Sequence, residues 1–148
     1  MTTFVQARDD IQALFWAYWS AQAPAQNSGA VPDVRWQWLD SPGTPPDLTK
    51  PWARVTIRHN DGGQSTFGPT GQRRFTKTGE VFVQVFAPIN KVGATQLENL
   101  GTIAQDAFEG KTTTNGVMFR RVVAREGETY QGWNQVTVVA SFTYDDVK

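Results

Sequence analysis

The chain has 148 residues and a formal net charge of zero, because 14 basic side chains are balanced by 14 acidic ones. This length is typical of one domain that buries a full core, so residues 1–148 are expected to fold as a single unit. The balanced charge excludes a uniformly basic nucleic-acid binder. The absence of cysteine excludes disulfides and thiol chemistry, and a single histidine, His59, argues against a histidine-rich metal site.

No targeting segment is expected at the N-terminus. It lacks a basic region followed by an apolar run, and Asp9 and Asp10 interrupt the apolar residues there. No stretch approaches the roughly 20 apolar residues of a membrane-spanning helix. The sequence therefore predicts no membrane partner and folding in the cytosol.

Residues 3–20 are predicted to form the first helix. Thr3 and Gln6 have the spacing of a capping box, and Pro24 prevents continuation. Apolar side chains recur at intervals of three and four, which is more typical of core packing than of a partner-binding face. These side chains are Phe4, Ala7, Ile11, Leu14, Phe15, Tyr18 and Trp19.

The next segment, residues 21–50, is rich in proline and is expected to run as an extended connector along the domain. Within it, residues 34–40 (VRWQWLD) are a candidate short strand. The segment before the connector is too short to fold alone, so the connector is not a domain boundary.

From Trp52 onward the apolar residues alternate with a period of two, which is typical of strands. Residues 52–59 and 80–86 are the first two main strands. Both faces of the second are largely apolar, which predicts a central strand covered on each side. The polar, glycine-rich residues 60–78 between them are predicted to form a long loop rather than a tight turn.

A second helix is predicted over residues 94–109, with Gly110 as its stop signal, followed by strands over 117–125 and 133–144. The two terminal strands are expected to pair as an antiparallel hairpin, and the helical crossover allows a parallel pair. The element order predicts an α+β, two-layer domain. Its sheet and second helix span residues 52–145, with a mixed, mostly antiparallel sheet of about four to five strands packed by two amphipathic helices.

No constellation in the sequence indicates catalysis, a metal site or a cofactor. His59 lies at a predicted strand end, where a polar turn residue is the simpler interpretation. Residues 63–70 have the glycine frame of a phosphate loop, but Pro69 stands where the lysine is required. The carboxylate pairs lack calcium-loop spacing. The sequence therefore predicts that the protein is not an enzyme.

The charge is unevenly distributed along the chain. Residues 50–77 carry six basic side chains against Asp61, a net charge of +5, and the remainder carries −5. Opposed fields of this kind favour contacts in which one copy meets the next. The candidate interface residues are Arg58, Arg73, Arg74, Phe75, Lys77 and Trp133.

Two other interpretations of these residues stay open. Residues 71–77 (GQRRFTK) have the clustered bases and the aromatic ring of a single-stranded nucleic-acid site, and exposed tryptophans are typical of carbohydrate platforms. A solvated, mobile loop is the simplest alternative.

Three phrases resemble the tail terminator (tail-tube capping) proteins of long-tailed bacteriophages and the related head-tail joining proteins. They are GEVFVQVFAP at residues 79–88, FEGK at 108–111 and GWNQVTVVASFTY at 132–144. The resemblance extends over nearly the whole chain and rests on packing residues rather than on catalytic ones.

The resemblance implies a structural virion protein. It implies a homohexameric ring that caps the tail tube, ends tube polymerisation and offers a joining surface to the head-side connector protein. DNA would pass through the ring without sequence-specific contact, and no enzymatic activity is implied. The protein would be assembled in the host cytoplasm and reside in the tail or neck of the virion. The tube protein, a neighbouring subunit and the lumen remain three alternatives for what residues 60–78 contact.

Overall fold

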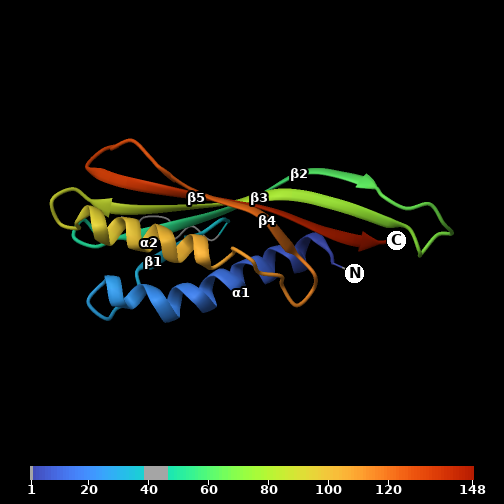
Figure 1. Ribbon diagram of the computed structural model, residues 1–148, viewed down its shortest axis with the longest axis horizontal. Coiled ribbons are helices and arrows are strands. Elements are labelled where there is room, and N and C mark those ends of the chain that lie inside the picture. Colours follow the sequence, from blue (N-terminus) through green and yellow to red (C-terminus); the bar gives the residue numbers. More distant parts are fainter. Residues whose placement is uncertain (1, 39–46) are drawn as a thin grey trace.

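The computed structural model describes residues 2–38 and 47–148, which form two layers (Figure 1). A five-stranded sheet makes one layer and two α-helices make the other, which confirms the predicted α+β class. In chain order the elements are α1 (Phe4–Gln22), the 3-10 helix η1 (Ala23–Gln26), β1 (Asp33–Trp36), β2 (Trp52–Gln64), β3 (Arg74–Pro88), α2 (Ala94–Asp106), β4 (Met118–Glu126) and β5 (Trp133–Val147). Neither α-helix of the described chain is long and apolar enough to cross a membrane.

The strands are ordered β1-β2-β3-β5-β4, and every neighbouring pair is antiparallel except β1 with β2. The predicted hairpin of the two terminal strands is confirmed. The crossover through α2 makes β3 and β4 parallel, but β5 lies between them, so the parallel neighbours are β1 and β2 instead. β1 lies inside the predicted connector, and residues 39–40 of that strand prediction lie outside the described residues.

Helix α1 begins as the sequence predicts. The Thr3 hydroxyl accepts a hydrogen bond from the Gln6 amide, and the Gln6 side chain accepts one from the Thr3 amide. One side of α1 is fully buried in the core at Ala7, Ile11, Phe15 and Trp19. The predicted apolar stripe therefore packs into the core, although Phe4 at its start is 60% exposed.

Helix α2 lies close to β5. Its buried side carries Leu97, Leu100 and Ala104, and a Cβ atom placed on Gly101 would stand 2.8 Å from Val136 Cγ1. A glycine here lets the helix approach the sheet. The helix ends at Asp106, three residues before the predicted end.

The two faces of the sheet differ. The helices cover the face to which Val81, Val83 and Val85 of β3 point, and all three are fully buried. Neither α1 nor α2 covers the opposite face, where Phe82 and Phe86 are only half-buried, so the expectation of cover on each side does not hold for the described residues. We call this surface the open face. Its residues on β2 to β5 are Trp52, Arg54, Thr56, Arg58, Glu80, Phe82, Gln84, Phe86, Arg121, Val123, Arg125, Trp133, Gln135, Thr137, Val139 and Ser141.

The long loop predicted over residues 60–78 is mostly strand. β2 continues to Gln64 and β3 begins at Arg74, so only residues 65–73 connect them. Glycine and polar residues have weak strand preference, but β5 continues to Val147 and pairs with β3 as far as Arg74. Backbone pairing with this distant segment overrides the local preference. We call residues 60–78 the distal hairpin.

Candidate functional site

The structure divides the six predicted interface residues among three places. Arg73, Arg74, Phe75 and Lys77 lie together on the distal hairpin, whereas Arg58 lies on the open face. Trp133 lies on the same face as Arg58 but at the end of the sheet away from the hairpin. The β3–β5 ladder pairs Arg74 with Val147 and Pro88 with Trp133, and a strand rises about 3.4 Å per residue, which separates the two ends by about 48 Å. The six residues therefore do not form one site.

The connection at the end of the distal hairpin is closed by hydrogen bonds. The Ser65 amide donates to the Arg74 carbonyl at 2.8 Å, and the Arg74 amide donates to Thr66 Oγ1 at 2.8 Å. Arg73 Nε donates to the Gly68 carbonyl at 2.7 Å, and the backbones of Arg73 and Lys148 exchange two hydrogen bonds. The connection is therefore a hydrogen-bonded turn whose side chains, apart from Thr66, are exposed to solvent.

Carboxylates from β5 lie among the basic residues of the distal hairpin. Arg74 Nε lies 3.6 Å from Asp145 Oδ2, and Lys148 Nζ lies 3.3 Å from Asp146 Oδ2. The half-buried Phe75 ring lies between two ammonium groups, with Lys77 Nζ at 5.9 Å and Lys148 Nζ at 6.0 Å from its centroid. The positive field that the sequence predicts for this segment is therefore partly neutralised.

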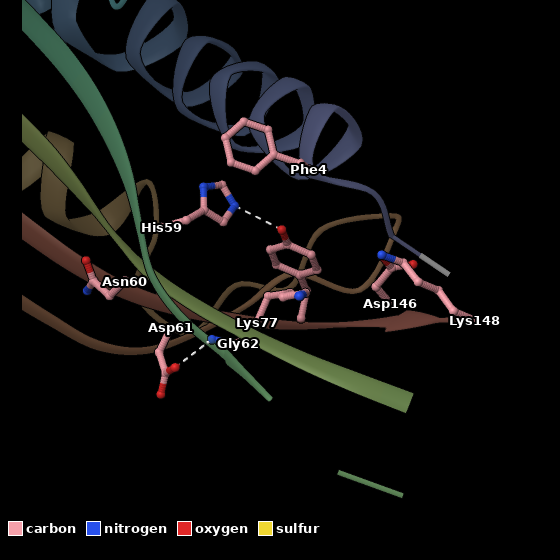
Figure 2. Close-up of a pocket in the computed structure, with 9 residues that line it drawn as sticks. Phe4, His59, Asn60, Asp61, Gly62, Lys77, Asp146 and Lys148 are labelled. Atoms are coloured by element: carbon pink, nitrogen blue, oxygen red, sulfur yellow. Dashed lines mark hydrogen bonds and ion pairs between the residues drawn. The ribbon is translucent and has the colours of Figure 1, made fainter. Parts of the chain in front are cut away.

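A cleft of about 520 Å³ lies between the start of α1, the irregularity in β2 after His59, and the end of β5. Figure 2 shows side chains of both charge signs around it. Its lining residues are Phe4, His59, Asn60, Asp61, Gly62, Lys77, Tyr144, Asp146 and Lys148.

His59 and Tyr144 form a pair at the wall of this cleft, and Figure 2 labels His59 and draws its hydrogen bond as a dashed line. His59 Nε2 and the Tyr144 hydroxyl are 2.9 Å apart, and the Phe4 ring stacks on His59 with centroids 4.1 Å apart. The expectation of a turn residue at position 59 was wrong, because β2 continues past it.

Burial lowers the pKa of His59, with the charge of Lys77 adding to the effect. Burial also raises the pKa of Tyr144, with Asp146 adding to it. Both groups are therefore neutral near pH 7. Within residues 2–38 and 47–148, no group of three or more His, Asp or Glu side chains is arranged to hold a metal ion. What the pair does is join α1, β2 and β5.

Aromatic rings line the open face, and arginine side chains lie over them. We call the rings of Trp52, Phe82, Phe86 and Trp133 the aromatic floor. The Trp52 and Phe86 rings stack with centroids 4.4 Å apart, and Trp133 meets Trp52 edge-on at 6.1 Å. The Arg54 guanidinium lies 5.5 Å from the Phe86 ring, and that of Arg58 lies 5.7 Å from the Phe82 ring. Such contacts cover the rings and hold the cations above them.

The open face is positively charged. Its residues on β2 to β5 include four arginines and one carboxylate, a net charge of +3. No arginine of this set forms an ion pair with a carboxylate of the described residues. Arg54, Arg121 and Arg125 were not among the predicted interface residues, because the charges were grouped along the chain. The period-two alternation of β2 and β4 was the signal that could have placed them on one face.

Solved structures, but no family model and no curated protein, match this chain. A chain from the virion of a native gene transfer agent (GTA) particle has a TM-score of 0.60 at 14% identity, over 94% of each chain. A further solved structure, whose description states no activity, has a TM-score of 0.63 at 19% identity, over 95% of this chain and 96% of that one. At such identities the likeness shows a shared fold.

Proposed function

We propose that this chain is a structural virion protein. The observation that carries the proposal is the fold shared with a gene transfer agent virion component along 94% of both chains, together with the tail-terminator phrases in the sequence. In this proposal the protein is not an enzyme and works through repeated contacts. The neutral His59–Tyr144 pair, which holds three elements together, fits that role.

The finer proposal is a tail terminator. Copies of the chain form a ring, proposed to be a hexamer, that caps the tail tube and ends its polymerisation. The ring offers a joining surface to the head-side connector protein, and DNA passes through it without sequence-specific contact. The protein is assembled in the host cytoplasm and resides in the tail or neck of the virion.

The test combines the purified protein with polymerising tube protein. We expect it to assemble at tube ends, to shorten the tubes as its concentration rises, and to sediment with them as a ring. Tubes of unchanged length, together with a protein that neither self-associates nor binds tube ends, would exclude the terminator role.

A second candidate function is nucleic-acid or carbohydrate binding by the aromatic surfaces. The arginines over the aromatic floor favour it, because base stacking and phosphate contact use such groups. However, the chain's own guanidinium groups already lie over Phe82 and Phe86. An oligonucleotide titration at two salt concentrations tests this candidate.

A further inference from the structure

The outer side of α1 is unusual for a helix that faces solvent. Residues 11–22 contain no charged side chain, although five of these twelve residues are exposed. A solvent-facing helix side is normally polar, and a helix that is apolar all round is normally buried. We call the exposed line along this helix the outer strip. It consists of Val5, Asp9, Ala13, Trp16, Ala17 and Ala21.

Small side chains make the outer strip accessible to a flat partner. Ala13, Ala17 and Ala21 follow one another at intervals of one helical turn, which leaves a smooth surface. Beside them Trp16 is 44% exposed and meets the Trp36 ring edge-on at 6.3 Å, which holds it in place. An aromatic side chain held in a fixed position is typical of interface centres.

The helix layer, to which the outer strip belongs, and the open face carry opposite charges. The segments that carry the two helices, residues 4–22 and 94–109, have one basic and five acidic side chains, a net charge of −4. The open face has a net charge of +3. The helix layer and the open face lie on opposite sides of the molecule (Figure 1). A contact between them in two copies would therefore leave one surface of each copy free for the next.

We propose that the outer strip of α1 in one copy packs on the open face of a second copy. The strip packs over the arginines and the half-buried rings of the open face, and the acidic side chains of the helix layer meet Arg54, Arg58, Arg121 and Arg125. The contact completes a helix–sheet–helix sandwich, which is the usual environment of a sheet with two apolar faces. This inference rests on the proposed ring and specifies which surfaces of this chain join neighbouring subunits.

Charge reversal on each surface tests the pairing. The sheet variant combines Arg54→Glu, Arg121→Glu and Arg125→Glu, and the helix variant combines Asp9→Lys, Glu98→Lys and Asp106→Lys. All six positions are exposed, so both variants should fold. Alone, each variant presents like charges at every contact, and we expect self-association at low salt to weaken about 100-fold.

Mixing the two variants is the decisive step. In an alternating assembly each contact again joins opposite charges, so an equimolar mixture should recover the sedimentation of the wild-type assembly. A sheet-to-sheet contact would instead be recovered by mixing the sheet variant with wild-type protein. A loss of oligonucleotide binding in the sheet variant, with self-association unchanged, would assign the open face to nucleic acid.

A size-based variant tests the outer strip independently of the acidic side chains. Ala17→Arg places a long cationic side chain on the strip and should abolish self-association. Thr70→Arg adds the same side chain to the exposed hairpin connection and should leave self-association unchanged.

The outcomes separate this inference from the proposed function. The inference alone would be overturned if the sheet variant, the helix variant and Ala17→Arg all still formed rings and capped tubes as the wild-type protein does. A mixture that stays monomeric, or a wild-type protein that stays monomeric at low salt, would also overturn it. Failure to affect tube ends at all would overturn the proposed function.

Discussion

The two faces of the central sheet carry similar apolar residues but meet different surroundings. On β3, Val81, Val83 and Val85 are sealed by the chain's own helices, whereas the alternate residues Phe82 and Phe86 lie beneath arginines of β2. Burial against helices stabilises one face in the isolated chain. The other face keeps apolar area and unpaired positive charge at the surface, which is the composition of a contact region rather than of a core.

The largest loss of stability is expected when a buried ring is removed from the core between the helices and the sheet, on the sheet face that the helices cover. Phe15 is fully buried and packs against Trp19, Trp36 and Phe108 with ring centroids 5.3 to 6.0 Å apart. We expect Phe15→Ala to lower the free energy of unfolding by about 3–5 kcal/mol, because it removes burial and leaves a cavity. Denaturant unfolding measures the loss. A loss below about 1 kcal/mol would contradict the packing described here.

Adding a methyl group to the sheet face that the helices cover should cause the next largest loss of stability. A Cβ atom on Gly79 would stand 2.5 Å from Phe142 Cζ and would also meet the Arg58 carbonyl oxygen, which belongs to the backbone. Gly79→Ala should therefore destabilise the protein by about 1–3 kcal/mol. Gly63→Ala is the matched control, since nothing lies within 4 Å of its added Cβ. Equal melting temperatures for the two variants would exclude this close contact.

Removing one aromatic ring from the open face should cost less stability. Phe82 is half-buried and lies across from Thr56 and Val139 in the sheet. We expect Phe82→Ala to lower the free energy of unfolding by about 1 kcal/mol, because only part of its apolar area is removed from water. A stability loss as large as that of Phe15→Ala would contradict the difference between the faces. Self-association should weaken as well if the open face is a contact surface.

Much of the covered face could be predicted from local sequence. The capping box at Thr3 and Gln6 and the alternation of β3 and β5 are short-range patterns, and the structure confirms them. The distal hairpin could not be predicted in this way, because its strand pairing depends on residues 143–147, about 70 positions away. No local pattern in a glycine-rich segment reports a partner so distant.

The candidate sites were harder to predict for a related reason. Asp145 and Asp146 are brought to the basic hairpin by β5, and His59 is brought to Tyr144 by the pairing of both strands with β3. Charges counted along the chain could not show these neighbours. Grouping residues 117–125 by strand face as well would have placed Arg121 and Arg125 together on one side of that strand.

The His59–Tyr144 pair should make the stability of the protein depend on pH. The folded pKa of His59 lies below its unfolded value of about 6.5, so the unfolded chain binds the proton first as the pH falls. Stability should therefore decrease as the pH falls below about 6.5. Melting curves at several pH values should show this component in the wild type and lose it in His59→Gln. Tyr144→Phe is the control, since it removes the hydroxyl but keeps the histidine.

The smallest effect is expected at the exposed end of the distal hairpin. The Arg74–Asp145 pair spans 3.6 Å with side chains that are 56% and 41% exposed, so water and salt screen it. Arg74→Gln should change the free energy of unfolding by no more than about 0.5 kcal/mol.

The double variant that combines Arg74→Gln with Arg73→Gln should also leave self-association unchanged if copies meet through α1 and the open face. If the double variant instead abolished salt-dependent binding of a single-stranded oligonucleotide, the hairpin would be a nucleic-acid site, because phosphate contacts depend on such clustered arginines.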